Sequence, residues 1–113
     1  MDKIIQIVTT GDNRDLMEGI GRHLVEKRLA SCAQISGPIK STYWWKGKIE
    51  DATEWVCTLK TTSGLYARVE DTIRELHPYD VPEITAVDVE KALPAYADWV
   101  RLETNKLKRG EKA

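Results

Sequence analysis

Six polar side chains fall at the predicted ends of strands and in loops, where they could take part in chemistry: Cys32, Lys60, His77, Tyr79, Asp80 and Glu83. A thiolate, an imidazole and a carboxylate form a ligand set that suits copper or zinc. We therefore predict Cys32, His77 and Glu83 as metal ligands, with Lys60 and Tyr79 lining the same ligand cleft. The bound ion would be Cu(II) or another divalent cation, and no residue pattern points to an obligatory cofactor.

Each of these residues also has a purely structural explanation. A cysteine outside a disulfide is usually a small buried hydrophobe, and His77 could cap the carbonyl groups at the end of a helix. Glu83 could simply pair with Lys60 or another basic group. Cys32 and His77 could form a nucleophilic thiol-imidazole pair, but nothing in the sequence places them within hydrogen-bond distance. We expect no enzymatic activity.

Several other kinds of site are excluded by residue spacing or charge. The chain has no CxxC, HxxxH or HExxH pattern for zinc and no GxGxxG, Walker or GxSxG motif. Its 17 Lys and Arg residues against 18 Asp and Glu residues give a formal net charge of −1. A nucleic-acid-binding domain would normally be basic. We expect no nucleic-acid partner.

The order of predicted elements indicates an α+β fold. Residues 3–9 form a short apolar strand, and residues 14–29 show the apolar spacing of a helix with one buried face. A hairpin over residues 32–61, a helix over 64–76 and a strand over 83–89 follow, and a C-terminal helix opens near Pro94. This order is typical of the ferredoxin-like split β-α-β arrangement, with helices on one face of an antiparallel sheet. We predict a single domain spanning residues 1–113.

The hairpin is longer than the domain that carries it. It turns at Lys46-Gly47, where glycine supplies a positive φ, and each arm could reach roughly 45 Å. A domain of this length has a diameter near 35 Å, so the hairpin must bend, with Gly37-Pro38 as the expected position. The part beyond the bend would expose aromatic surface, which usually belongs to an interface. We therefore predict an obligate oligomer whose interface includes Tyr43, Trp44, Trp45 and Trp55.

The two cysteines lie on opposite arms of the hairpin. With Trp45 opposite Lys48, Cys32 would face Thr61 and Cys57 would face Ser36. The thiols would then be about 13 Å apart along the ribbon, which is too far for a disulfide. Free thiols fit a reducing cytosol. No signal-peptide pattern or membrane-length apolar stretch occurs, so we expect a cytoplasmic protein without a membrane partner.

Five segments together resemble one known family. The chain contains, in order, KRLASCAQI, STYWWKGKIED, LKTT, HPYDVPEI and PAYADWV. These closely resemble the CutA divalent-cation-tolerance family over nearly the whole chain. The resemblance implies a tight homotrimer in which the long hairpins pair across subunits, an arrangement similar to that of PII signalling proteins. It also implies a cytoplasmic role in tolerance of copper and other divalent metals, with copper binding proposed and no established enzymatic activity.

Carried over by position, the resemblance places Cys32 in the family's LAAC-like turn, His77 in its HPY motif and Glu83 in its PE motif. Some members carry a cysteine at the end of the first strand, where this chain has Thr9-Thr10. A metal site that relied on that thiol would be weaker or absent here, which leaves His77 and Glu83 as the stronger candidates. The leading interpretation is a trimer that binds metal in intersubunit clefts. A PII-like regulatory module that binds a small anion or metabolite in the same cleft, or a purely structural trimeric scaffold, is the alternative.

Overall fold

The computed structural model describes residues 2–104 and has the predicted order of elements. Its regular elements are, in chain order, β1 (Ile4–Gly11), α1 (Arg14–Glu26), β2 (Cys32–Trp45), β3 (Lys48–Thr62), a 3₁₀ turn (Ser63–Leu65), α2 (Tyr66–Leu76), β4 (Ile84–Asp88) and α3 (Pro94–Glu103). The four strands form one antiparallel sheet in the order β2-β3-β1-β4. This order agrees with the predicted split β-α-β arrangement, and the α+β prediction is confirmed.

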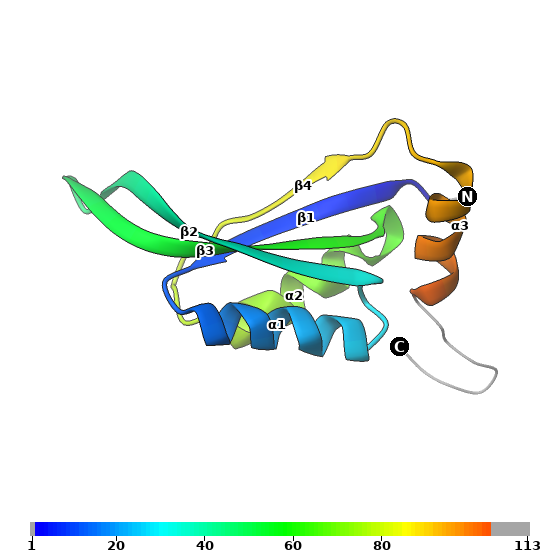
Figure 1. Cartoon of the computed structure of the whole chain (residues 1–113). Coiled ribbons are helices and arrows are strands. Elements are labelled where there is room, and N and C mark those ends of the chain that lie inside the picture. Colours follow the sequence, from blue (N-terminus) through cyan, green and yellow to red (C-terminus); the bar gives the residue numbers. More distant parts are fainter. Residues whose placement is uncertain (1, 105–113) are drawn as a thin grey trace.

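The core lies between the sheet and two helices. In Figure 1, α1 and α2 both lie against the same face of the sheet. Because side chains alternate across a strand, one set of alternate residues points to these helices and is buried. The residues that build this core are Ile5 and Ile7 of β1, Cys57 and Leu59 of β3, Met17, Ile20 and Leu24 of α1, and Val69 and Ile73 of α2.

The other face of the sheet is covered by neither α1 nor α2. We call it the open face; its members are Gln6 and Val8 of β1, Gln34 of β2, Thr58 and Lys60 of β3, and Thr85 and Val87 of β4. None of these side chains is fully buried. Val87 is 61% exposed, although a β-branched apolar residue in a sheet is normally covered.

The ladder between β2 and β3 is interrupted where the bend was expected. Its register shifts by one residue between Ser36 and Ile39, and Gly37 has a φ of +140°. Trp45 pairs with Lys48 as predicted, but this shift places Cys32 opposite Lys60 rather than Thr61. The predicted register was therefore wrong on one side of the bend, because one extra residue in β2 displaces every pair beyond it.

Cys57 is displaced in the same way and lies opposite Ile35 rather than Ser36. The two thiols remain out of step, and both are free, as predicted. Burial raises the pKa of Cys57 to about 12. Its thiol is therefore fully protonated at neutral pH and is not a nucleophile there.

Capping explains where α1 begins and why α2 begins later than predicted. The Asn13 side chain accepts a hydrogen bond of 2.9 Å from the Leu16 amide, which is a standard N-cap. The second helix was predicted to begin at residue 64. Instead a 3₁₀ turn comes first, Thr62 makes no side-chain cap, and the α-helix proper begins at Tyr66.

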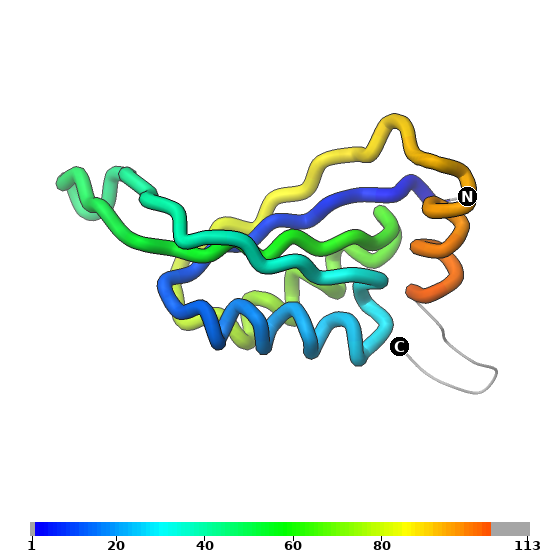
Figure 2. Tube along the Cα trace, in the orientation of Figure 1, coloured from blue at the N-terminus to red at the C-terminus, as the bar shows by residue number. Residues whose placement is uncertain are grey.

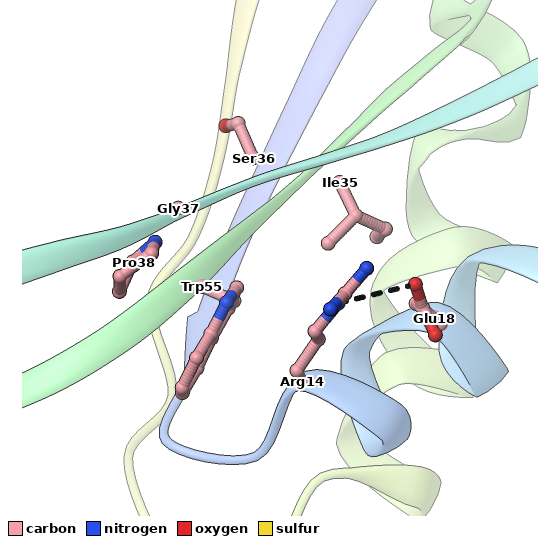
Figure 3. A pocket seen from close by; sticks show the side chains of 7 residues that line it. All are labelled: Arg14, Glu18, Ile35, Ser36, Gly37, Pro38 and Trp55. Carbon is pink, nitrogen blue, oxygen red and sulfur yellow. Dashed lines mark ion pairs between the residues drawn. The ribbon is translucent and has the colours of Figure 1, made fainter.

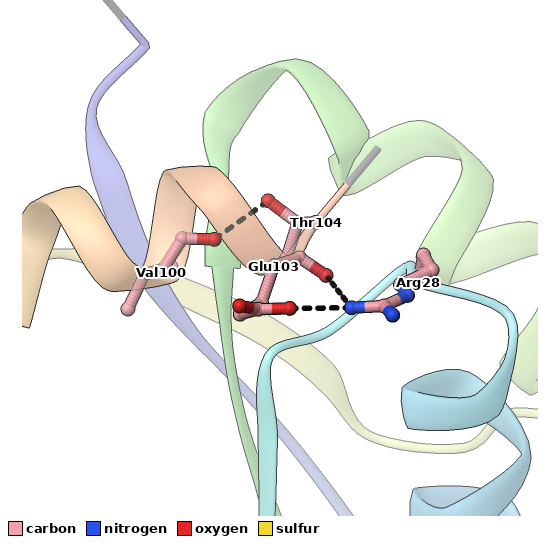
Figure 4. Close-up of polar contacts among 4 residues, drawn as sticks. All are labelled: Arg28, Val100, Glu103 and Thr104. Atoms are coloured by element: carbon pink, nitrogen blue, oxygen red, sulfur yellow. Dashed lines mark hydrogen bonds and ion pairs between the residues drawn. The ribbon is translucent and has the colours of Figure 1, made fainter. Parts of the chain in front are cut away.

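The helix α3 packs at the end of the molecule where β1 begins, as Figure 2 shows. Its buried residues Ala97 and Val100 contact Ile4. Arg28, in the turn after α1, donates to the backbone carbonyl of Glu103 at 3.4 Å and to its carboxylate at 2.5 Å (Figure 4). The Thr104 hydroxyl donates to the Val100 carbonyl at 2.8 Å. These bonds fix the last turn of α3 to the rest of the chain.

The turn between β2 and β3 lies at the opposite end of the molecule from α3 (Figure 1). The principal dimensions are 49 × 31 × 23 Å and the radius of gyration is 15.0 Å. A compact domain of this length would have a radius of gyration of about 13 Å. The aromatic residues near the turn are exposed, with Tyr43 at 41%, Trp44 at 71% and Trp45 at 43%.

Candidate metal and ligand site

Cys32 and Lys60 lie directly opposite each other on β2 and β3. The half-buried Cys32 is at the start of its strand, and the Lys60 ammonium donates to the side-chain oxygen of Gln34. Cys32, Lys60 and Gln34 therefore form one polar cluster at the α3 end of the sheet. Burial and then the charge of the nearby Cys32 raise the pKa of the Tyr96 phenol in α3. Tyr96 was not among the predicted site residues.

His77 holds the connector after α2 to the end of β1. Its imidazole is 7% exposed, and both ring nitrogens are engaged by the backbone. Nδ1 accepts a hydrogen bond of 3.1 Å from the Tyr79 amide, and Nε2 lies 2.7 Å from the Thr10 carbonyl oxygen. Because Nδ1 is an acceptor, the proton of the neutral ring is on Nε2, which donates to Thr10.

This arrangement bears on the prediction that His77 binds metal. A metal ion needs a nitrogen lone pair, and in this chain the lone pair on Nδ1 is already used. The alternative explanation, that His77 caps helix-end carbonyl groups, is wrong for its side chain, which bonds to β1 instead. Metal ligation by His77 would require the Tyr79 hydrogen bond to break.

Tyr79 and Glu54 form a second link between the connector and the hairpin. The Tyr79 hydroxyl donates to the Glu54 carboxylate at 2.9 Å, and the rings of Tyr79 and His77 meet edge to face at 4.6 Å. Burial, the hydrogen bond to Glu54 and the negative charge of Glu54 raise the pKa of Tyr79 above its usual range. The phenol thus stays protonated and remains a donor.

Sequence analysis missed Glu54 as a site residue. Its carboxylate is only 5% exposed, which is rare for a charged side chain. It lies within an acidic segment whose other carboxylates, at Glu50 and Asp51, are exposed. The signal that could have found it is position, since Glu54 is the acidic residue nearest the predicted bend at Gly37-Pro38.

Glu83 is exposed just before β4, and its carboxylate accepts a hydrogen bond of 3.2 Å from the Thr85 hydroxyl. It does not pair with Lys60. Ile84 lies opposite Thr9 on β1 whereas Lys60 lies opposite Gln6. Three residues along β1 separate these positions by about 10 Å.

The predicted ligands thus form two groups at different levels of the sheet. Cys32 and Lys60 lie at the level of Gln6, and His77 bonds to Thr10, four residues further along β1. That separation is about 13 Å along the strand. Within residues 2–104, no three His, Cys, Asp or Glu side chains come together to hold a metal ion. A single chain therefore does not assemble the Cys32, His77 and Glu83 site.

Trp55 differs from the other aromatic residues predicted at an interface. Its indole is half-buried against the core on the helix-covered face, beside the first turn of α1 (Figure 3). Its packing is therefore accounted for within one chain. Tyr43, Trp44 and Trp45 have no such cover, and the Lys46 ammonium lies 5.8 Å from the centre of the Trp45 ring.

Among the helices of residues 2–104, none is long and apolar enough to cross a membrane.

Asp80, the remaining predicted polar residue, is exposed on the connector and lines an open groove with Asp71 and Arg74 of α2.

Comparisons with known proteins agree with the sequence motifs. The family model described as CutA1 divalent ion tolerance protein matches residues 5–103. The divalent-cation tolerance protein CutA of Archaeoglobus fulgidus is 42% identical over 94 residues, which cover 83% of this chain and 91% of that protein.

Solved structures show the same fold. The crystal structure of CutA from Xylella fastidiosa matches with a TM-score of 0.88 and 35% identity, covering 91% of this chain and 99% of that one. The Archaeoglobus fulgidus structure, described as the periplasmic divalent cation tolerance protein CutA, matches with a TM-score of 0.83 and 40% identity over 86% and 94% of the two chains. Because the family match spans both the sheet and the helices, this chain belongs to the CutA divalent-cation-tolerance family.

Proposed function

We propose that this chain acts as a non-enzymatic homotrimer that binds divalent cations, Cu(II) among them, between its subunits. The observation that supports this most is the amount of apolar surface left without cover in one chain. Trp44 is 71% exposed and Val87 on the open face is 61% exposed. Exposed apolar surface on this scale usually marks an interface. A cytoplasmic role in tolerance of divalent cations would follow from the family, although one relative is described as periplasmic.

The separation of the predicted ligands favours a site made by two chains. Cys32 lies at one level of the sheet and Glu83 at another. In a closed ring of identical subunits, different surfaces of neighbouring copies meet. The Cys32 cluster of one subunit could then lie against the Glu83 segment of the next and supply the thiolate and carboxylate together. The His77 imidazole would serve mainly to position that segment.

Calorimetric titration with Cu(II) tests the metal part of this proposal. We expect measurable binding to the full chain, and Cys32→Ser and Glu83→Gln should each weaken it by about tenfold, the loss reported for removing part of a metal site. Glu90→Gln, an exposed carboxylate in the loop after β4, is the matched control and should leave binding unchanged. Unaltered heats in both Cys32→Ser and Glu83→Gln would exclude these residues as ligands. His77→Ala is less informative, because it removes two structural hydrogen bonds.

A PII-like regulatory module that binds a small anion in the same intersubunit cleft is the second candidate. The Lys60 ammonium beside Cys32 favours it, because a cation next to a polar pocket attracts anions. A thermal-shift screen separates the candidates, since a ligand that binds the native state raises the melting temperature. Stabilisation by nucleotides or organic acids, lost in Lys60→Gln, would support this function. If neither metals nor anions bind, a structural trimeric scaffold would remain.

A further inference from the structure

A cavity of about 290 Å³ lies on the helix-covered face of the sheet, at the bend of the hairpin. Its walls come from three elements that meet there (Figure 3): Arg14 and Glu18 of α1, Ile35, Ser36, Gly37 and Pro38 of β2, and Trp55 of β3. Pockets for small molecules begin at about 300 Å³. The cavity is therefore of a size for a small organic molecule rather than for a nucleotide.

The Trp55 indole forms a flat wall of this cavity, and the bend in β2 makes room for it. A Cβ atom at Gly37 would lie 2.8 Å from Cδ1 of Trp55, so only glycine allows β2 to pass so close to the indole. The Trp55 ring and the Ile35 side chain supply apolar surface on the strand side (Figure 3). A planar apolar body could stack on that surface, because aromatic rings favour offset contact.

Arg14 supplies the charge. Its Nε lies 3.4 Å from the Glu18 carboxylate, and this is the ion pair recorded for its guanidinium. Because this contact is made through Nε, the two terminal nitrogen atoms lie at the far end of the group. They form a planar pair of donors of the kind that binds a carboxylate through two parallel hydrogen bonds. The Arg14 side chain is 65% exposed, so a ligand can reach it from solvent.

We propose that this cavity binds a small planar carboxylate, with the carboxylate on the terminal nitrogen atoms of Arg14 and the flat body on Trp55. The site is formed within one chain. It lies on the opposite face of the sheet from Lys60, so it is separate from the intersubunit metal or anion site proposed above. A ligand bound there would contact both the first turn of α1 and the bend of the hairpin.

Nuclear magnetic resonance titration of the full chain with sodium benzoate tests the proposal directly. The indole N–H signal of Trp55, identified by its absence in Trp55→Phe, should shift in a saturable way. Benzamide has the same flat body without the charge and should cause a much smaller shift. Absence of a saturable shift with benzoate, or an equal response to benzamide, would overturn the proposal.

Two substitutions in the cavity test how its charged side chains affect ligand binding. Arg14→Gln should weaken benzoate binding by about tenfold or more, because it removes a charge-assisted pair of hydrogen bonds. Glu18→Gln should strengthen binding about two- to threefold, because it removes a competing negative charge near the ligand. If Glu18→Gln weakened benzoate binding instead, Glu18 would not compete with the ligand for Arg14, and the proposed arrangement of charges would be wrong.

Arg22 offers a matched control on the same helix. It pairs with Glu26 through the same atoms and spacing, at 3.2 Å, and does not line the cavity. Arg22→Gln should leave the benzoate affinity unchanged. An equal loss in Arg14→Gln and Arg22→Gln would show that benzoate responds only to net charge, which would overturn the assignment to this cavity. Neither variant alters Cys32, Lys60 or Glu83, so failure here would leave the proposed function untouched.

Discussion

Two fully buried threonines show how the contribution of a hydroxyl group to stability depends on its hydrogen-bond partner. The Thr61 hydroxyl donates to the Leu29 carbonyl at 2.6 Å. The Thr9 hydroxyl has no hydrogen-bond partner among residues 2–104, although Thr9 is 0% exposed. A buried polar group without a partner costs its desolvation energy and gains nothing in return.

Thr9→Val should therefore raise the free energy of unfolding by about 1 kcal/mol, because it replaces an unpaired hydroxyl with a methyl group of the same shape. Thr61→Val is the matched control and should lower stability by about 1–3 kcal/mol, because it leaves the Leu29 carbonyl unpaired. Urea unfolding at one protein concentration measures both. A loss of stability in Thr9→Val would mean that its hydroxyl has a partner in solution.

At the scale of elements, the bend in β2 decides where side chains of the hairpin lie. Gly37 has a φ of +140°, and Trp55 and the Glu54 carbonyl lie close to where a Cβ atom would be. The one-residue shift there sets the pairing of Cys32 with Lys60 on one side of the bend. It also lets β2 pass close to the Trp55 indole, which lines the cavity described above. A single backbone irregularity thus positions residues of both proposed sites.

Gly37→Ala should lower the free energy of unfolding by about 2–3 kcal/mol, since a Cβ atom would meet Trp55 at 2.8 Å in a conformation that L residues rarely adopt. Gly47→Ala in the hairpin turn is the control. Its φ is also positive, at +78°, but nothing lies within 4 Å of the added atom. It should cost only about 1 kcal/mol. Equal losses in the two variants by urea unfolding would show that crowding at the bend contributes nothing.

At the scale of the whole molecule, the two ends of this chain differ in how well their apolar residues are covered. The α3 end is fixed by apolar packing of Val100 and by the bonds of Arg28 to Glu103. The hairpin end exposes Tyr43, Trp44 and Trp45, and its turn extends beyond the helices in Figure 1. Two-stranded ribbons are marginal in water unless something packs on them. We infer that other copies of the chain stabilise this end.

Light scattering of the purified chain should therefore give about three times the chain mass of 12.8 kDa. Trp44→Glu should reduce the mass or make it fall on dilution, because it places a charge in a buried contact. Lys27→Glu, exposed after α1, changes charge away from the hairpin and should keep the mass of the unaltered chain. A folded single chain at micromolar concentration would contradict the trimer and any site between subunits.

The sequence by itself determined the order of elements, the helix-facing core and the free thiols, as well as the position of the bend at Gly37-Pro38. These features depend on local rules: the periods of strands and helices, caps, and the turn preferences of glycine and proline. The motifs also determined the family. Residue types alone were enough to single out Cys32, His77 and Glu83, but not to say whether they meet.

Only the tertiary structure decided how these side chains are used. It engaged both nitrogen atoms of His77 with the backbone, buried Glu54 under Tyr79, and turned Trp55 towards its own core. Thr10 is distant in sequence from His77, and Glu54 is distant from Tyr79. The pairing of distant groups is set by how the layers pack. A local pattern can name the residues at a site, but it cannot fix the distances between them.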